Sequence, residues 1–405
     1  MEPFEFRADQ TALNDLQERL ARTRWPNDVS DPDWTFGTDP IYLRGLVEYW
    51  QNGFDWRTQE ASLNHFHHFR TTIDGIGIHF VHERGVGPNP IPLVLTHGWP
   101  GTFHDFSKIV PLLTDPGSHG GDPADAFDII VLSLPGYGFS DAPVESWFSR
   151  KIPTLWAALM EGLGYSRFGA HGLDVGSLVC NRLAIEYPQR IAGIHVTYTG
   201  EPYLGAGAAP LTELERAFLA GRPGGQETGG GYAHIQRTKP VTLAYGLNDS
   251  PVGLAAWNIE KYRSWSDCDG DIESRFTRDE LLTTVMIYWL TGTIGSSFRT
   301  YRDWALGAES NPAVWENREE IPRGIASKPL ARNESIGVPA AVALFPADPP
   351  ASMPREWAER VYADLRRFTL MPRGGHFPAM EEPELLAEDL REFFRPLRGA
   401  PDLVG

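Results

Sequence analysis

Cysteine is scarce in this 405-residue chain, and long apolar runs and an excess of positive charge are missing from it. Its two cysteines, Cys180 and Cys268, cannot form a disulfide framework, and no Cys/His spacing suggests zinc. No apolar run approaches the roughly 20 residues that cross a bilayer. The formal net charge of −17 disfavours nucleic acid or an anionic membrane surface as partner. We therefore expect a soluble, cytoplasmic protein without a membrane anchor that acts on small molecules.

From residue 91 onward, apolar strand patterns alternate with helix patterns. Strands and helices of this length in alternation indicate an α/β fold with a mostly parallel, doubly wound sheet. Ligands bind such sheets at the carboxyl ends of the strands, so the residues that follow each strand are the candidates for a site. The expected strands are Pro92–Thr96, Phe127–Ser133, Arg167–Ala170, Ile191–Thr199, Val338–Phe345 and Phe368–Met371.

Composition divides the chain into four segments. The first holds two amphipathic helix patterns and a strand pair, and we interpret it as an extension that wraps the core and a lid. The third is helical and rich in aromatic residues, which indicates a lid inserted into the sheet domain. The segments are residues 1–85 (extension), 86–200 (first part of the core), 201–330 (helical lid) and 331–405 (second part of the core, closing with a helix over Glu381–Phe394).

One strand end carries the stretch His171-Gly172-Leu173-Asp174-Val175-Gly176-Ser177. Gly-x-Asp-x-Gly between a strand and a helix is the pattern of a nucleophile elbow, in which Ser is the usual central residue. A helix N-terminus favours the negative charge of an aspartate. An ionised carboxylate attacks without a base and forms a covalent ester. The alternative is a glycine-rich turn in which Asp174 only caps the helix.

Two further strand ends supply an acid and a histidine. Asp348 follows the strand that ends at Phe345, and His376 follows two glycines after the last strand. Nucleophile, acid and histidine then occur in the chain order of an α/β-hydrolase. His376 is the candidate general base, although a loop histidine without function is the alternative. Asp348 is the candidate orienting acid, although it could cap a helix and Glu356 or Asp364 could replace it.

The strand before residue 97 runs into His97-Gly98-Trp99-Pro100-Gly101. The backbone N–H groups of Trp99 and Val175 are the candidate oxyanion hole, with simple packing as the alternative for Trp99. Because Trp99 precedes a proline, its peptide bond can be trans or cis, and the sequence leaves this open.

These motifs together resemble the microsomal-type epoxide hydrolases over nearly the whole chain. The resemblance also rests on three stretches of the lid, residues 231–236, 247–256 and 288–294, and on Arg373-Gly374-Gly375-His376-Phe377. It implies that two lid tyrosines, Tyr232 and Tyr301, donate hydrogen bonds to the epoxide oxygen. Without it, each is a packing aromatic. Membrane-bound members carry an amino-terminal anchor, and some use Glu where this chain has Asp348.

The resemblance implies an epoxide hydrolase that converts an apolar or aromatic epoxide into a vicinal diol through an ester on Asp174. Water activated by His376 then hydrolyses the ester, and no metal or organic cofactor takes part. The partners would be the small-molecule epoxide and water, with a homodimer as a further option. The alternatives are a haloalkane dehalogenase, which often has Trp where Val175 stands, and an inactive hydrolase fold used for binding.

Overall fold

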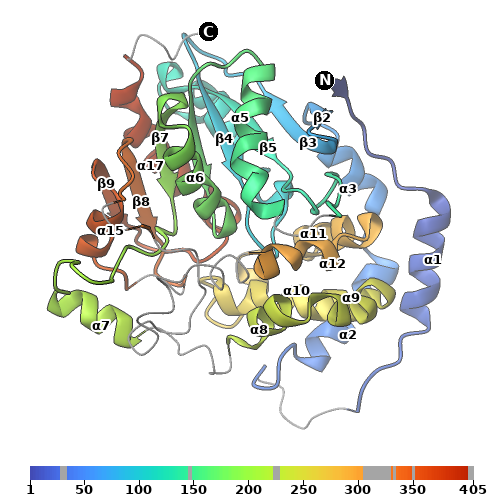
Figure 1. Cartoon of the computed structure of the whole chain (residues 1–405). Helices are drawn as coiled ribbons and strands as arrows, with labels where there is room; N and C mark the ends of the chain where they lie inside the picture. The colour runs from blue at the N-terminus through green and yellow to red at the C-terminus, as the bar shows by residue number, and fades with distance from the viewer. Residues whose placement is uncertain are drawn as a thin grey trace.

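The computed structural model describes residues 1–27, 34–144, 148–221, 229–303, 330–331, 334–348 and 352–399. These residues form one nine-stranded sheet in the order β1-β2-β3-β5-β4-β6-β7-β8-β9 (Figure 1). Neighbours from β1 to β5 pair antiparallel, and those from β5 to β9 pair parallel. The strands are β1 (Glu2–Pro3), β2 (His68–Ile73), β3 (Ile76–Glu83), β4 (Ile91–Thr96), β5 (Phe127–Leu132), β6 (Phe168–Gly172), β7 (Ile191–Val196), β8 (Ala340–Leu344) and β9 (Leu365–Leu370).

The central strands are apolar because helices cover both of their faces. All six residues of β4 are buried, as are all of those of β5 and β7. In the register, Thr96 of β4 lies opposite Leu132 on one side and Gly172 on the other. The carboxyl ends of these three strands are therefore level, and the residues that follow them meet at one edge.

Helices flank the sheet as a doubly wound fold requires, which confirms the predicted fold class. Helices α5 and α6 pack side by side in front of the sheet in Figure 1, and α17 packs against α4 and against β7 and β9. These helices are α4 (Ile109–Thr114), α5 (Ile152–Gly162), α6 (Val175–Glu186), α15 (Arg355–Val361), α16 (Pro378–Glu381) and α17 (Pro383–Phe394).

The chain segment that connects β7 to β8, called the insertion below, forms a layer of helices beneath the sheet in Figure 1. The amino-terminal helices contact it, since α1 and α2 both touch α10. The segment boundaries inferred from composition stay a prediction, and residues 222–228 and 304–329 lie outside the described part. The helices are α7 (Glu213–Gly221), α8 (Gly231–Thr238), α9 (Pro240–Asp249), α10 (Pro251–Trp265), α11 (Arg278–Thr291) and α12 (Ile294–Ser297), and before them α1 (Gln10–Ala21), α2 (Pro40–Asn52) and α3 (Trp56–Leu63).

Several element ends differ from the sequence prediction by a few residues, and two of these differences have a clear physical reason. The closing helix expected over Glu381–Phe394 is divided into α16 and α17 at Glu382, because Pro383 has no N–H to continue the first helix. Strand β9 begins at Leu365 rather than Phe368, since it is the outermost strand and carries arginines that no alternation of apolar residues reveals.

No single helix in the described residues is both long and apolar enough to cross a membrane, although the bent pair Arg278–Thr291 and Ile294–Asp303 passes the same criteria when taken together.

A buried carboxylate joins β7, β9 and α17. Asp389 of α17 accepts a hydrogen bond from His195 Nε2 at 2.8 Å, and its other oxygen accepts bonds from Arg367 and Thr369. Burial alone would raise the pKa of Asp389, but these bonds, chiefly that of His195, lower the pKa to about 2. The charged form is thus strongly favoured in the folded protein.

We expect Asp389→Ala to lower the free energy of unfolding by about 3–5 kcal/mol, because His195 and Arg367 lose a buried partner. Denaturant unfolding measures this. Glu388→Ala, at an exposed position of the same helix, is the control and should cost at most about 1 kcal/mol. The folded pKa is depressed, so the stabilisation by Asp389 is complete above about pH 4 and is lost as the pH falls towards 2. Equal losses in the two variants would contradict this role.

Candidate active site

The turn at Asp174 is built by close contact between backbones. A side chain at Gly172 would place its Cβ 2.2 Å from the Gly176 carbonyl carbon, and one at Gly176 would place it 2.0 Å from the Thr96 oxygen. Asp174 itself has φ +47°, in the left-handed region that side chains rarely adopt. Strand β6 therefore passes into α6 through a sharp turn that directs one side chain to the strand ends, as the elbow pattern predicts.

The Asp174 carboxylate faces across the strand ends instead of capping its helix. It occupies the N-cap position of α6 but makes no capping hydrogen bond. Its Oδ2 instead accepts the Trp99 N–H at 3.0 Å. Burial raises the pKa of Asp174, while His376 and the N–H groups of Trp99 and Val175 act in the opposite direction. The two predicted oxyanion donors thus both face this carboxylate. The Trp99–Pro100 peptide bond, which the sequence left open, is cis.

His376 lies beside this carboxylate and is held by an acid from the neighbouring strand. Its Nδ1 is 2.9 Å from Oδ1 of Asp348, which follows β8. Asp364, an alternative acid, pairs instead with Arg366. Burial alone would lower the pKa of His376, but Asp348, Asp174 and Glu381 together raise it to about 9. The imidazole is therefore cationic at neutral pH as long as these carboxylates are charged.

The loop that carries His376 is bound to the end of α10. The His376 N–H donates to the Trp265 carbonyl at 2.8 Å, and the Gly374 N–H donates to Asp267 at the same distance. Gly375 permits this approach, because a Cβ there would lie 2.4 Å from the Trp265 oxygen. Glu381 completes the junction by accepting the N–H groups of Asp267 and Phe377.

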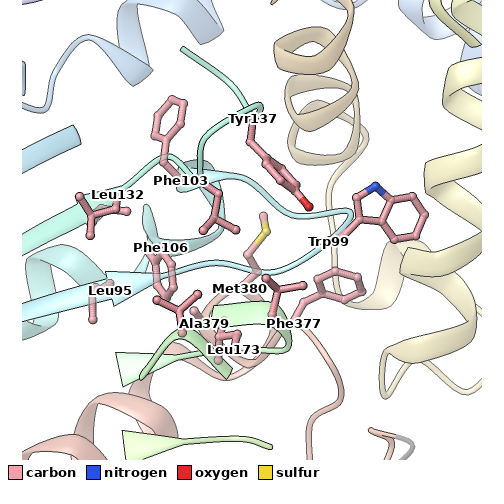
Figure 2. Packing of buried hydrophobic residues seen from close by; sticks show 14 of the residues in the cluster. Leu95, Trp99, Phe103, Phe106, Leu132, Tyr137, Leu173, Phe377, Ala379 and Met380 are labelled. Atoms are coloured by element: carbon pink, nitrogen blue, oxygen red, sulfur yellow. The ribbon is translucent and has the colours of Figure 1, made fainter. Parts of the chain in front are cut away.

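Both predicted tyrosines lie over Trp99. The ring of Tyr232, from α8, stacks on the Trp99 indole with centroids 5.3 Å apart and planes 11° apart. Tyr301, just beyond α12, meets the same indole edge-on at 6.0 Å, and the two phenol rings are 5.9 Å apart. Burial, above all, raises the pKa of both phenols, so both are neutral donors at neutral pH. Figure 2 shows Trp99 at the right of the buried cluster, beside the helices, while Leu95, Phe106 and Leu173 lie to its left, nearer the strands.

The structure also brings three ionisable residues to this region that the sequence analysis did not single out. Glu381 is buried, and its pKa is raised to about 7 chiefly by that burial. Asp105 is likewise buried, with a pKa of about 7 for the same reason, and His376 acts on it in the opposite direction. The ammonium of Lys261 lies over the Tyr232 ring. Among the described residues, no group of three His, Cys, Asp or Glu could hold a metal ion.

Comparison with known proteins gives two family matches. Residues 1–106 match the model described as epoxide hydrolase N terminus, and residues 91–234 match the model of the α/β hydrolase fold. The first match covers the extension and β4 up to Phe106, and the second contains the elbow.

Relatives and solved structures extend these matches over the whole chain. Epoxide hydrolase 1 of Sus scrofa is 38% identical, with 96% of this chain and 88% of that one covered. The structure of an Aspergillus niger epoxide hydrolase superposes with a TM-score of 0.81 at 27% identity, covering 98% and 96% of the two chains. Juvenile hormone epoxide hydrolase of the silkworm Bombyx mori gives a TM-score of 0.78 at 28% identity, covering 98% and 94%.

We expect Gly98→Ala to reduce catalytic activity by about 100-fold, the size expected for a reacting group displaced by about 1 Å. The new Cβ would lie 2.4 Å from Cβ and 2.6 Å from Oδ2 of Asp174, which must then move. Steady-state kinetics measures this, and circular dichroism checks the fold. Gly246→Ala, at an open position of α9, is the matched control and should keep full activity. An active Gly98→Ala enzyme would show that the position of Asp174 is not critical.

Proposed function

The chain belongs to the epoxide hydrolase family of the α/β-hydrolase fold, and we propose that it opens its epoxide through a covalent ester on Asp174. One observation carries the proposal. The carboxylate of Asp174 faces the Trp99 N–H and the His376–Asp348 pair at one edge of the sheet, and two neutral phenols lie over Trp99 on the insertion side.

In the first step, the epoxide lies between Asp174 and the two phenols. A carboxylate oxygen forms a bond to one ring carbon while the bond from that carbon to the epoxide oxygen breaks. Tyr232 and Tyr301 stabilise the negative charge that develops on this oxygen, which becomes a hydroxyl group when one of the phenols gives it a proton. The product is a hydroxyalkyl ester on Asp174, and this step needs no base.

The pKa of His376 then sets the order of the two steps. While Asp174 is charged, His376 has a pKa of about 9 and holds a proton, so it cannot act as a base at neutral pH. Ester formation removes the charge of Asp174, which is one cause of the raised pKa. The pKa of His376 therefore falls, and the imidazole can release its proton only after alkylation.

In the second step, neutral His376 takes a proton from water through Nε2, because Asp348 engages Nδ1. The water attacks the carboxyl carbon of the ester, and the N–H groups of Trp99 and Val175 hold the resulting oxyanion. Collapse breaks the ester bond as protonated His376 gives a proton to the leaving alkoxide, which departs as the vicinal diol. The acid left on Asp174 carries one oxygen from water and becomes a carboxylate again by passing its proton to His376.

An apolar or aromatic epoxide fits this site best. The walls around the proposed epoxide position are aromatic, with Trp99, Tyr232, Trp265 and Tyr301 packed on one another. The family relationship favours epoxide hydrolysis over the dehalogenase and over an inactive binding protein. The cytoplasmic location and the homodimer stay predictions.

We expect the diol from one turnover in heavy-oxygen water to contain little label, because its second oxygen comes from Asp174. Excess enzyme and styrene oxide as substrate make the test single-turnover, and mass spectrometry should find the label in the Asp174 peptide. His376→Gln should accumulate an adduct on that peptide, since alkylation needs no base. A fully labelled first-turnover diol, with no adduct on His376→Gln, would mean direct attack by water.

We expect Asp174→Asn, which mimics the neutral ester, to lower the pKa of His376 from about 9 by about one unit or more, the usual effect of losing a nearby charge. NMR titration of histidine-labelled enzyme measures this, with His376→Gln to assign the signal. Asp364→Asn, at the partly exposed acid that pairs with Arg366, should leave the His376 titration unchanged. An unchanged pKa in Asp174→Asn would contradict the proposed order of steps.

A further inference from the structure

Lys261 of α10 keeps its ammonium group inside the protein. The residue is only 7% exposed, and Nζ lies 4.6 Å from the ring centroid of Tyr232 and 5.5 Å from that of Trp265. Lysine usually extends its charged end to water, because burial of an ammonium is unfavourable. Its ion-pair partner is Glu260, the adjacent and more exposed residue, so this pair alone gives no reason for the ammonium to point inward.

The ammonium of Lys261 lies over the ring of Tyr232, which is one of the two phenols proposed to donate to the epoxide oxygen. Burial and the Asp174 carboxylate raise the pKa of Tyr232, which opposes the release of its proton. Ring opening nevertheless requires the phenol to share or give up that proton while negative charge grows on the epoxide oxygen. A cation over an aromatic face is attracted by the ring and stabilises negative charge on it.

The two phenols differ in this respect. Among the described residues, a cation lies over the Tyr232 ring, whereas no such contact involves Tyr301. The hydrogen bond between the two hydroxyls adds to the difference, since it lowers the pKa of Tyr232 and raises that of Tyr301. The cation and the shared hydrogen bond thus both favour proton release from Tyr232 over release from Tyr301.

We propose that Lys261 is an electrostatic positioning residue for epoxide opening, whose ammonium stabilises the charge that develops on Tyr232 as this phenol passes its proton to the epoxide oxygen. The inference rests on the proposed covalent function. In the balanced step, Asp174 gains the carbon–oxygen bond, the ring carbon–oxygen bond breaks, and the phenol proton moves to the released oxygen. Tyr232 becomes a phenolate, and the proton that His376 releases after alkylation restores the phenol through solvent. Lys261 does not touch the reacting atoms.

Because Lys261 acts only on the first step, the two steps must be timed separately. Rapid quenching with excess enzyme and styrene oxide, followed by mass spectrometry of the Asp174 peptide, gives the rates of ester formation and of ester decay. We expect Lys261→Met to slow ester formation about 30-fold, which equals about 2 kcal/mol and is the size of a cation–π contact shielded from water. Ester decay should keep its rate.

Three further variants separate charge from packing. Lys261→Arg should recover most of the rate of ester formation, because a guanidinium also interacts with aromatic faces. In a Tyr232→Phe background, Lys261→Met should have no further effect, since the group that it acts on is gone. Lys239→Met, at an exposed lysine that ends α8, is the matched control and should behave as the wild type.

Glu260→Gln keeps the buried lysine, so it tests the proposed role of Lys261 even if the Lys261→Met variant is unstable. Glu260 raises the pKa of Tyr232, so its neutralisation should leave ester formation as fast or faster. Slower formation in Glu260→Gln would overturn the inference. So would equal slowing of formation and decay by Lys261→Met, or its full effect in the Tyr232→Phe background. If the wild type forms no ester, the proposed function fails first, and an intact wild-type ester with no effect of Lys261→Met rejects this inference alone.

Discussion

The rest of the structure depends on one constraint, which is the burial of ionisable side chains at the carboxyl ends of the central strands. Asp348, Asp174 and Glu381 are all close enough to His376 to raise its pKa. In water such interactions are weak, but inside a protein they determine which proton is held where. The helices of the insertion exclude solvent here, and the paired N–H donors and the cationic imidazole make the buried carboxylates tolerable.

The residues predicted from sequence are those whose role is imposed locally. Glycines on both sides of Asp174 are required wherever one strand passes so tightly into a helix, and the contacts of Gly172 and Gly176 show why. His376 follows from its place after the last strand. Strands such as β4 are visible because burial on both faces leaves a continuous apolar run.

What could not be predicted depends on neighbours distant in the chain. Tyr232 and Tyr301 were found only through the family resemblance, because an aromatic residue in a helical layer serves packing equally well. Nothing in the sequence distinguishes Lys261 from an exposed lysine, since its position over Tyr232 arises from the packing of α8 beside α10. The same holds for Asp105, whose burial raises its pKa only in the folded chain.

The hydrogen bonds between the His376 loop and the end of α10 make the place of the base depend on two parts of the chain. Trp265 and Asp267 belong to the segment between β7 and β8, whereas His376 and Gly374 follow the last strand of the sheet. A shift of the α10 end relative to the sheet would therefore break these bonds or carry the His376 loop with it. In either case the imidazole would leave its place beside Asp174. The orientation of the base is thus a property of the assembled helices and sheet, and neither part defines it alone.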